Sequence, residues 1–292
     1  MSRSSPLSTL LLALPLLLTF TYFAWWPLVR AVILSAQHTD LLDGSEWVGF
    51  ENFRRVLDDP LLWTAVKNTA WFALLALIFG FPVPIVLALL MSESRRWRGL
   101  FSTLAYLPVV VPPVAAILLW RVFYDASSTG TFNTVLGWVG LGPYPWYQST
   151  SWAMGSIVML ATWSAAGATV IIYLAALTGV RTELYEAAEV DGASILRKLW
   201  HVTLPQLRSV LFVTLILQLI GTFQVFTEPF LLTTGGPANS TMTILLLIYR
   251  YAFGAGGGGD YGAAAALSLM LAAFLAVFTA VYFRATRSWS TS

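Results

Sequence analysis

The sequence predicts an all-α membrane protein with six transmembrane helices and a cytoplasmic loop that projects between the fourth and fifth of them. Of its 292 residues, 58% are hydrophobic and only 10% are charged, and the mean hydropathy is +0.74. A soluble domain carries about 25% charged residues, so this chain has too little polar surface to cover a globule of its size in water. In a bilayer every backbone polar group must be satisfied internally, which helices achieve within one segment. We expect a single transmembrane domain over residues 1–292.

A helix needs about 20 mostly apolar residues to cross a bilayer, and six stretches reach that length. They are residues 7–34, 71–91, 100–123, 152–180, 207–232 and 263–283. The first stretch is too long for the apolar part of a signal peptide and no small-residue cleavage pattern follows it, so we expect it to span. A further apolar run, 244–249, is too short to span. Prolines such as Pro112 and Pro113 interrupt several stretches and can bend the helices.

The distribution of positive charge predicts the orientation, because cytoplasmic segments are enriched in Lys and Arg. With the N-terminus inside, the cytoplasmic segments hold 10 of the 16 basic residues. These are Arg3, Arg95, Arg96, Arg98, Arg181, Arg197, Lys198, Arg208, Arg284 and Arg287. The opposite loops collect acidic residues. We therefore expect both termini in the cytoplasm, together with the loop over about 181–206.

That loop has the pattern of two short helices joined by a sharp turn. Thr182 is a candidate N-cap for the first helix, and Gly192 suits a left-handed turn at its end. Ser194 can cap a second helix over 195–201, and Pro205 fits the first turn of the next span. From composition alone, a charged connector that is merely solvated remains an alternative.

The order of residues in the loop is more specific than its composition. It reads Glu186-Ala187-Ala188, two further residues, Asp191-Gly192-Ala193, and later Leu204-Pro205. This order resembles the EAA loop of the permease subunits of bacterial ATP-binding-cassette (ABC) importers, which docks onto the ATPase subunit. Two positions depart from the family pattern: Leu199 replaces an aromatic residue and Ser209 replaces a proline. The resemblance implies these coupling residues: Glu186, Ala187, Ala188, Asp191, Gly192, Ala193, Leu204 and Pro205.

Four further segments are similar to carbohydrate permeases of the maltose-transporter type, in particular to the first of two paired permeases. They read VGFENF at 48–53, KNT at 67–69, LTTGGPANST at 232–241 and IYRYAF at 248–253. The resemblance implies a subunit that moves a di- or oligosaccharide, or a related sugar, into the cytoplasm. It also implies three kinds of partner in a bacterial inner membrane system: a second homologous permease, two copies of a cytoplasmic ATPase, and an extracytoplasmic sugar-binding protein.

Glu228 is the one acidic residue inside a predicted span, and it marks a candidate substrate pathway. An unpaired charge in lipid costs on the order of 3 kcal/mol, so Glu228 should face the bundle interior or a watery cavity. Gln224, four residues earlier, would share its helical face. The candidate pathway residues are Thr222, Phe223, Gln224, Glu228, Asn239 and Tyr249. Alternatively, Glu228 reaches water near the outer end of the span or pairs with Arg250 or Arg121.

No motif for catalysis by this chain is present. There is no G-x-x-x-x-G-K-[ST] loop to hold nucleotide phosphates and no H-E-x-x-H metal motif. We therefore expect a non-catalytic subunit that binds no cofactor itself, with ATP and magnesium held by the partner ATPase. An ion-coupled secondary sugar carrier is the competing interpretation, because such carriers place ionisable groups near mid-membrane.

Overall fold

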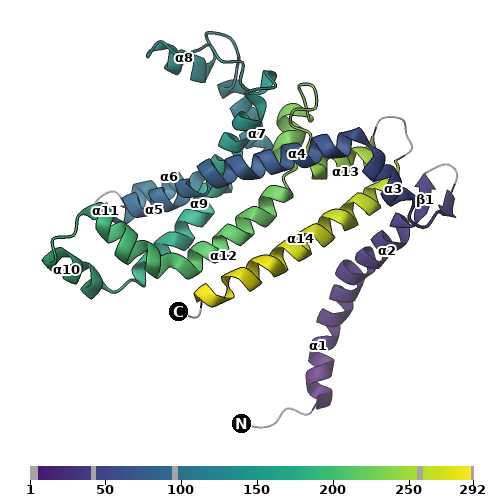
Figure 1. Cartoon of the computed structure of the whole chain (residues 1–292), viewed down its shortest axis with the longest axis horizontal. Helices are drawn as coiled ribbons and strands as arrows, with labels where there is room; N and C mark the ends of the chain where they lie inside the picture. The colour runs from purple at the N-terminus through teal and green to yellow at the C-terminus, as the bar shows by residue number, and fades with distance from the viewer. Residues whose placement is uncertain (1–5, 41–43, 94–97, 255–258, 291–292) are drawn as a thin grey trace. The chain divides into compact units, whose positions relative to one another are not determined.

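A computed structural model describes residues 6–40, 44–93, 98–254 and 259–290 (Figure 1). Three of the arginines that predict the orientation, Arg3, Arg95 and Arg96, lie outside these residues. The chain divides into two compact units. The first comprises residues 1–62 and 247–274, and the second comprises residues 63–246 and 275–292.

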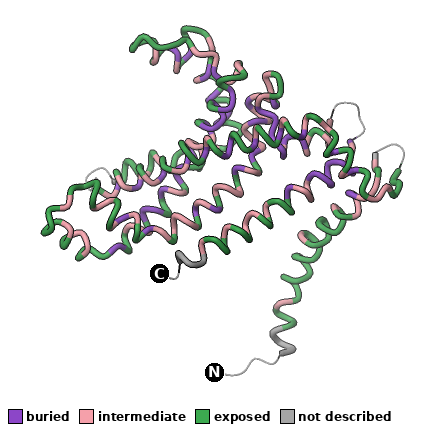
Figure 2. The backbone as a smooth tube through the Cα atoms, viewed as in Figure 1, coloured by how far each residue is buried: buried purple, intermediate pink, exposed green. Residues whose placement is uncertain are grey.

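The first unit begins with one long apolar helical segment. It consists of α1 (Pro6–Phe20), a π-helical turn η1 (Thr21–Trp25) and α2 (Trp26–Ser35). The part from Leu10 to Ser35 meets the length and hydropathy of a membrane span, and none of its most apolar stretch is buried inside the protein. Figure 2 shows this exposure along α1 and α2. The predicted first span is confirmed as a continuous helix.

After this span, the first unit continues with a small polar assembly. Strands β1 (Gln37–Asp40) and β2 (Gly44–Trp47) pair antiparallel, with Gln37 opposite Trp47. The amphipathic helix α3 (Glu51–Asp58) follows. Its buried Asn52 donates to the carbonyls of Ser35 and Gln37 at 2.9 and 2.8 Å. Arg55 of α3 forms an ion pair of 2.9 Å with Asp260, at the start of α14 (Tyr261–Ser290).

The second span contains a π-helical turn. It runs through α4 (Pro60–Leu75), η2 (Ala76–Gly80) and α5 (Pro82–Glu93). The amide of Phe81 donates to the carbonyl of Ala76 at 2.9 Å, five residues earlier. Such turns insert one extra residue into a helix and occur frequently at functional sites.

The predicted third span is not one straight helix. It consists of α6 (Arg98–Val110) and α7 (Pro113–Phe123), which are bent by 104° at the break between them. Two consecutive prolines explain the break. Pro113 removes a helical donor, and its ring forces the preceding Pro112 into the extended region (φ −55°, ψ 136°).

A loop follows α7 and contains α8 (Thr131–Gly137) and the 3-10 turn η3 (Trp146–Gln148). The buried Asn133 organises it. Its amide nitrogen donates to three backbone carbonyls, and its oxygen accepts from the amide of Tyr144 and from the indole of Trp146. This saturates the side chain and fixes the loop.

The fourth span, α9 (Ala153–Thr178), is the centre of the second unit. Figure 1 shows α5, α6, α9 and α12 lying side by side. A Cβ at Gly167 would lie 2.1 Å from the carbonyl oxygen of Ala105, so only glycine allows α6 to approach α9 this closely. The buried residues around α9 include Ile157, Leu160, Val170 and Tyr173.

The remaining elements are α10 (Thr182–Val190), α11 (Ile195–Lys198), the π-helical turn η4 (Leu199–Thr203), α12 (Leu204–Phe223), the π-helical turn η5 (Pro229–Thr233) and α13 (Ile244–Phe253). Within the described part of the chain, five helices are long and apolar enough to cross a membrane. The bent pair α6–α7 makes six if it counts as one span. The short helix α13 confirms that the run 244–249 is too short to span.

Candidate functional site

A cavity of about 630 Å³ lies inside the second unit. Its walls come from three spans: α4–η2–α5, α9 and α12, together with the residues that follow α12. Apolar residues supply most of the wall. The polar side chains that line it are Thr162, Thr169, Thr214, Gln218, Thr222, Gln224, Thr227 and Glu228. A mostly apolar cavity with a few convergent polar groups is typical of a small-molecule site.

Three of the predicted pathway residues line this cavity: Thr222, Gln224 and Glu228. Gln224 and Glu228 do not share a helical face, however, so that expectation was wrong. Helix α12 ends at Phe223, and the chain leaves helical geometry from Gln224 to Phe226. The break has a chemical cause in Pro229, which has no amide hydrogen to donate to the carbonyl of Val225 four residues earlier. The hydroxyl of Thr243 donates to that carbonyl instead, at 3.0 Å.

Glu228 therefore reaches the cavity from a separate helical turn beyond α12. One of the alternative partners considered for it, Arg121, is engaged elsewhere: its guanidinium donates to the backbone carbonyl of Leu231 at 2.5 Å. The other, Arg250, belongs to the first unit. Glu228 is partly exposed and lies on the wall of the cavity.

The other three predicted pathway residues lie away from this cavity. The ring of Phe223 packs edge-on against Phe278, with 5.8 Å between centroids. Asn239 is in an exposed turn and its carbonyl accepts from Asn68 at 2.7 Å. Tyr249 packs against Phe253 in the first unit.

Sequence reasoning missed the contribution of α9 to the cavity. Thr162 and Thr169 are seven residues apart, which places them on one side of a helix, and both line the cavity. This spacing of threonines in an apolar span is the signal that could have found them. No group of three or more histidine, aspartate or glutamate side chains suited to a metal ion occurs among the described residues.

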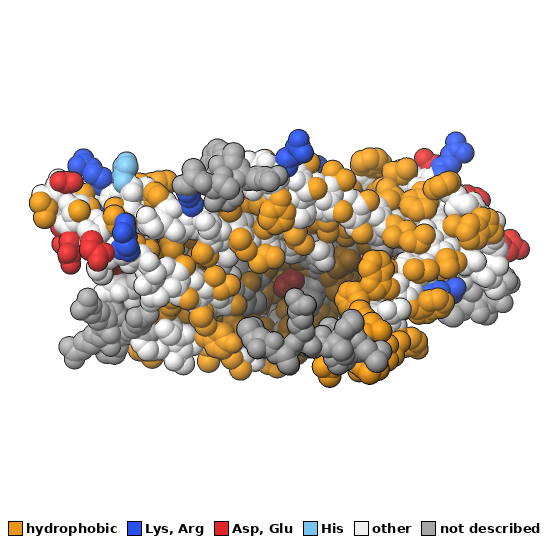
Figure 3. Space-filling view, turned by 90° about the horizontal axis from the view of Figure 1, so that it is seen from below, with side chains coloured by type: hydrophobic (Ala, Val, Ile, Leu, Met, Phe, Trp, Pro, Cys, Tyr) orange, Lys and Arg blue, Asp and Glu red, His pale blue; other side chains and the backbone are white. Residues whose placement is uncertain are grey.

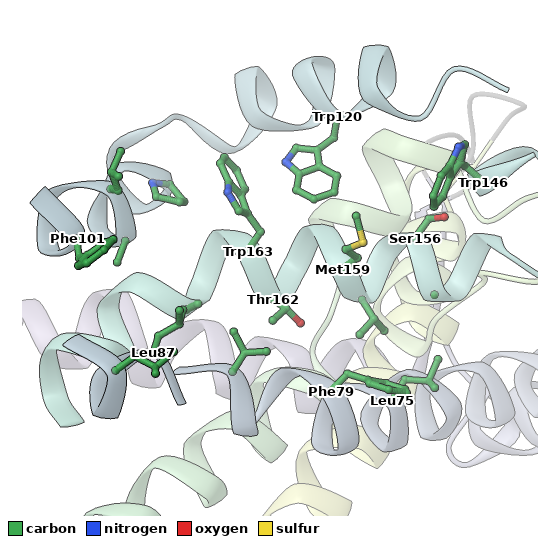
Figure 4. Close-up of a pocket in the computed structure, with 18 of the residues that line it drawn as sticks. Leu75, Phe79, Leu87, Phe101, Trp120, Trp146, Ser156, Met159, Thr162 and Trp163 are labelled. Carbon is green, nitrogen blue, oxygen red and sulfur yellow. The ribbon is translucent and has the colours of Figure 1, made fainter. Parts of the chain in front are cut away.

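A second cavity, of about 1000 Å³, shares Val158, Thr162 and Ala166 of α9 with the first and is almost entirely apolar. Figure 4 shows it in close-up, with Trp163 of α9 directed toward Trp120 of α7, and Thr162 directed to the opposite side, toward the helix that carries Phe79. The rings of Trp120 and Trp163 are 5.5 Å apart. Of these two α9 residues, Thr162 lines both cavities and Trp163 lines only the second.

The loop between the fourth and fifth spans has the predicted helix–turn–helix form. Gly192 is left-handed, with φ +70°. The amide of Ala193 donates to the carbonyl of Ala188 at 2.9 Å, and the amide of Gly192 donates to the carbonyl of Glu189 at 3.0 Å. This pair of hydrogen bonds is the Schellman motif, which satisfies the last carbonyls of a helix.

The predicted cap at Ser194 is confirmed, and the predicted cap at Thr182 is wrong. Ser194 caps α11, its hydroxyl accepting from the amide of Arg197 at 3.4 Å. Thr182 is not the N-cap of α10; it is the first helical residue, and the N-cap is Arg181, with no side-chain hydrogen bond. Pro205 lies in the first turn of α12, as predicted.

Two contacts join the arms of the loop. The ammonium of Lys198 donates to Glu189 at 2.7 Å. This hydrogen bond, and then the charge of Lys198, lowers the pKa of the Glu189 carboxyl below its ordinary value. The hydroxyl groups of Tyr185 and Thr203 are 2.9 Å apart. Since α10 has no buried residue, these contacts and the Schellman turn hold its position.

The predicted coupling residues are largely accessible. Glu186, Ala187, Asp191, Gly192 and Pro205 are exposed. The residues that are half-buried are Ala188, Ala193 and Leu204.

Four large apolar side chains are also exposed on this loop. Val190, Ile195, Leu196 and Trp200 are 88%, 81%, 68% and 65% exposed. Figure 3 shows charged side chains gathered at the end of the second unit that carries α10 and α11. Apolar side chains of this size in a charged, water-facing element indicate a surface that another protein covers.

The loop and Glu228 lie toward opposite ends of the spans. Helix α9 has 26 residues and ends just before the loop, so it is about 39 Å long at 1.5 Å per residue. Helix α12 leads away from the loop and ends just before Gln224. The loop therefore lies toward one end of these helices, and the part of the cavity lined by Gln224 and Glu228 lies toward the other.

Comparison with known proteins supports a transport function. Residues 80–290 match the model of the family described as "Binding-protein-dependent transport system inner membrane component". The arabinooligosaccharides transport system permease protein AraP of Halalkalibacterium halodurans is 33% identical over 92% of this chain and 84% of its own. The lactose transport system permease protein LacF of Rhizobium radiobacter is 32% identical over 94% and 92%. The sulfoquinovosyl glycerol transport system permease protein SmoG of Agrobacterium fabrum is 32% identical over 97% and 91%.

Solved structures show the same fold. A bacterial ABC transporter involved in import of the acidic polysaccharide alginate superposes with a TM-score of 0.82, at 29% identity, over 95% of this chain and 94% of the other. A second structure, of the bacterial alginate transporter in complex with an alginate pentasaccharide-bound periplasmic protein, gives a TM-score of 0.84 at 28% identity, over 96% and 94%.

Proposed function

The chain belongs to the family of binding-protein-dependent transport system inner-membrane components, and from this premise we propose how its cavity and its loop move a sugar. It is a permease subunit of an ABC importer, and ATP is hydrolysed by a separate ATPase subunit. The cargo is a di- or oligosaccharide or a related sugar, as the names of its relatives indicate for their own cargoes.

The cavity with Thr222, Gln224 and Glu228 is the observation that carries this proposal. A sugar carries many hydroxyl groups, each of which donates and accepts. Amide, hydroxyl and carboxylate groups supply the matching partners. Phe72 and Phe226 also line the cavity and offer aromatic faces to the C–H faces of a sugar ring.

The loop supplies the coupling surface. The exposed apolar side chains of Val190, Ile195, Leu196 and Trp200 dock into the ATPase, and Glu186 and Asp191 add exposed charges on the same loop. Aromatic and large apolar anchors of this kind contribute most of the binding energy of protein interfaces.

A continuous helix links docking to transport. Residues from Ile195 to Phe223 form one helical segment of 29 residues. It begins in the docking surface and carries Gln218 and Thr222 into the cavity. A movement of the ATPase against the loop therefore displaces one wall of the cavity directly.

The complete transporter contains a second, homologous permease and two copies of the ATPase, which hold ATP and magnesium. With the loop and both termini in the cytoplasm of a bacterial cell, the end of the cavity near Glu228 is directed to the outer side. A sugar-binding protein delivers the cargo there, in line with the alginate transporter solved with its periplasmic protein.

Uptake into proteoliposomes tests the proposal. The permease pair is reconstituted with its ATPase and binding protein, and uptake of labelled arabinotriose, lactose and sulfoquinovosyl glycerol is measured with and without internal ATP. We expect uptake that requires both ATP and the ATPase and that persists after ionophores collapse the proton and sodium gradients. Uptake that continues without the ATPase would overturn the proposal in favour of an ion-coupled carrier.

A further inference from the structure

The polar cavity carries charge of one sign only. Glu228 is the one ionisable side chain among the described residues that line it. The other polar side chains on its wall are the uncharged hydroxyls of five threonines and the uncharged amides of two glutamines. A molecule that enters this part of the cavity therefore meets one acidic group, and the described wall offers it no basic group.

The basic residues of the surrounding segments do not reach the cavity. The three spans that form its walls carry two basic residues in the described part of the chain, Lys67 of α4 and Arg208 of α12. Neither of them lines the cavity. Arg121 of α7 donates to the backbone carbonyls of Leu231 and Leu232 at 2.5 and 3.5 Å. These positive charges therefore leave the carboxylate in the cavity unbalanced.

The carboxyl group of Glu228 has no hydrogen bond or ion pair with another described residue. Because Glu228 is partly exposed, its carboxylate meets water in the cavity and can keep its negative charge there. Like charges repel over several ångströms, and salt screens this repulsion less in a cavity than on an open surface. A hydroxyl or ammonium group, in contrast, donates a hydrogen bond to a carboxylate.

The cargoes of similar proteins do not decide the charge of the sugar. LacF belongs to a lactose transport system, and lactose is neutral, whereas one of the similar solved structures is a transporter involved in import of the acidic polysaccharide alginate. Proteins of one fold thus serve cargoes of different charge. The charge preference of this chain must then come from the side chains that line its own cavity.

We propose that Glu228 makes this permease selective for neutral and amino sugars, and that it excludes sugars that bear carboxylate or sulfonate groups. This inference rests on the proposed sugar pathway and names the chemical class of its cargo. A hydroxyl group of a neutral sugar donates to the Glu228 carboxylate. The ammonium group of an amino sugar also balances its charge, whereas the carboxylate of a uronic acid can do neither.

The test is direct binding of matched sugars to the permease pair and its ATPase in nanodiscs, followed by saturation-transfer NMR titration. No binding protein is added, so its own selectivity does not enter, and both faces of the permease are accessible. The neutral sugars are cellobiose, maltose and α-1,4-galactobiose. Each is paired with the diuronate of the same rings and linkage, in which carboxylates replace the CH₂OH groups. Chitobiose, the β-1,4-linked glucosamine dimer, is the cationic partner of cellobiose.

We expect the wild type to bind the diuronate of a pair about ten- to a hundredfold more weakly than the neutral sugar, and to bind chitobiose more tightly than cellobiose. Glu228→Gln removes the charge and keeps the size of the side chain, and it should lower the ratio of the two dissociation constants to about threefold or less. Glu228→Lys should invert the ratio. The ratio is taken within one variant, so a change in overall affinity does not affect it.

Glu183→Gln is the matched control. It removes the same charge from an exposed residue of α10 that does not line the cavity, and the ratio should remain that of the wild type. An equal change of the ratio in Glu183→Gln and Glu228→Gln would show an effect of net charge and would overturn the proposal.

The possible failures are distinguishable. If the wild type binds a neutral sugar and its diuronate equally well, or if Glu228→Gln keeps the wild-type ratio, Glu228 does not select by charge, although the sugar pathway stands. If the wild-type complex binds no sugar of the panel, both the proposed sugar pathway and the selection by charge are rejected.

Discussion

Gly192 gives the sharpest test of the coupling loop, because its role is purely conformational. Its φ of +70° is left-handed, and a Cβ built there meets nothing within 4 Å. A substitution therefore causes no clash, and its cost is the backbone conformation alone. That cost is about 1–2 kcal/mol for an L-residue, lowest for asparagine and highest for a β-branched residue.

This strain weakens docking only if the loop relaxes when it is free. Few contacts oppose relaxation, since α10 has no buried residue and is held by the Glu189–Lys198 and Tyr185–Thr203 contacts. Docking must then restore the strained turn. A cost of 1–2 kcal/mol lowers the affinity for the ATPase by about 5- to 30-fold.

The assay is titration of the ATPase subunit onto the permease pair in nanodiscs, with Gly192→Asn, Gly192→Ala and Gly192→Val. We expect affinity to fall in that order. Gly137→Ala, in a helix of the loop after α7 with open space around its Cβ, is the control and should bind like the wild type. If Gly192→Val binds as tightly as the wild type, the left-handed turn does not define the docking geometry and the reasoning is refuted.

Three further predictions follow from the loop and the cavity. Trp200→Glu should abolish co-purification of the ATPase while the permease keeps its melting temperature, because Trp200 is exposed; a lower melting temperature would instead show a packing role. Lys198 lowers the pKa of Glu189, so their ion pair stabilises the loop above the ordinary glutamate value of 4.5 and loses that contribution as the pH falls through the lowered pKa. Lys198→Met should therefore make the affinity for the ATPase less dependent on pH between pH 7 and pH 3.5. A pH profile that matches the wild type would show that the ion pair does not stabilise the loop. Glu228→Leu should raise the sugar concentration that gives half-maximal ATPase stimulation by about tenfold or more, because a hydrogen bond to a charged group is lost. Phe223→Leu is the control and should leave this concentration unchanged, because Phe223 packs against Phe278 and does not line the cavity.

Features that depend on neighbouring residues could be predicted from the sequence. The apolar length of each span, the left-handed Gly192 and the cap at Ser194 all follow from interactions within a few residues. The same holds for the short helix α13. Prediction failed at Thr182, which is the first residue of the helix instead of its N-cap.

The breaks in the helices were only partly predictable. The pair Pro112–Pro113 indicates a bend, but the angle of 104° depends on how α7 packs. Pro229 indicates a helix break a few residues before it, but the apolar stretch 207–232 predicted one continuous span. The carbonyl of Val225, left without its helical donor, is satisfied by Thr243 eighteen residues later, and no local pattern reveals such a partner.

The sequence by itself determined that this chain crosses a membrane and which residues shape its charged loop, because hydropathy and capping act over one or two helical turns. Only the tertiary structure decided which polar residues share a cavity. Gly80, Thr162 and Gln218 come from three spans, and their meeting depends on the rotation and crossing of each helix against the others. Packing between distant segments sets the rotation and crossing of the helices, and neither can be read from the spacing of residues within one span.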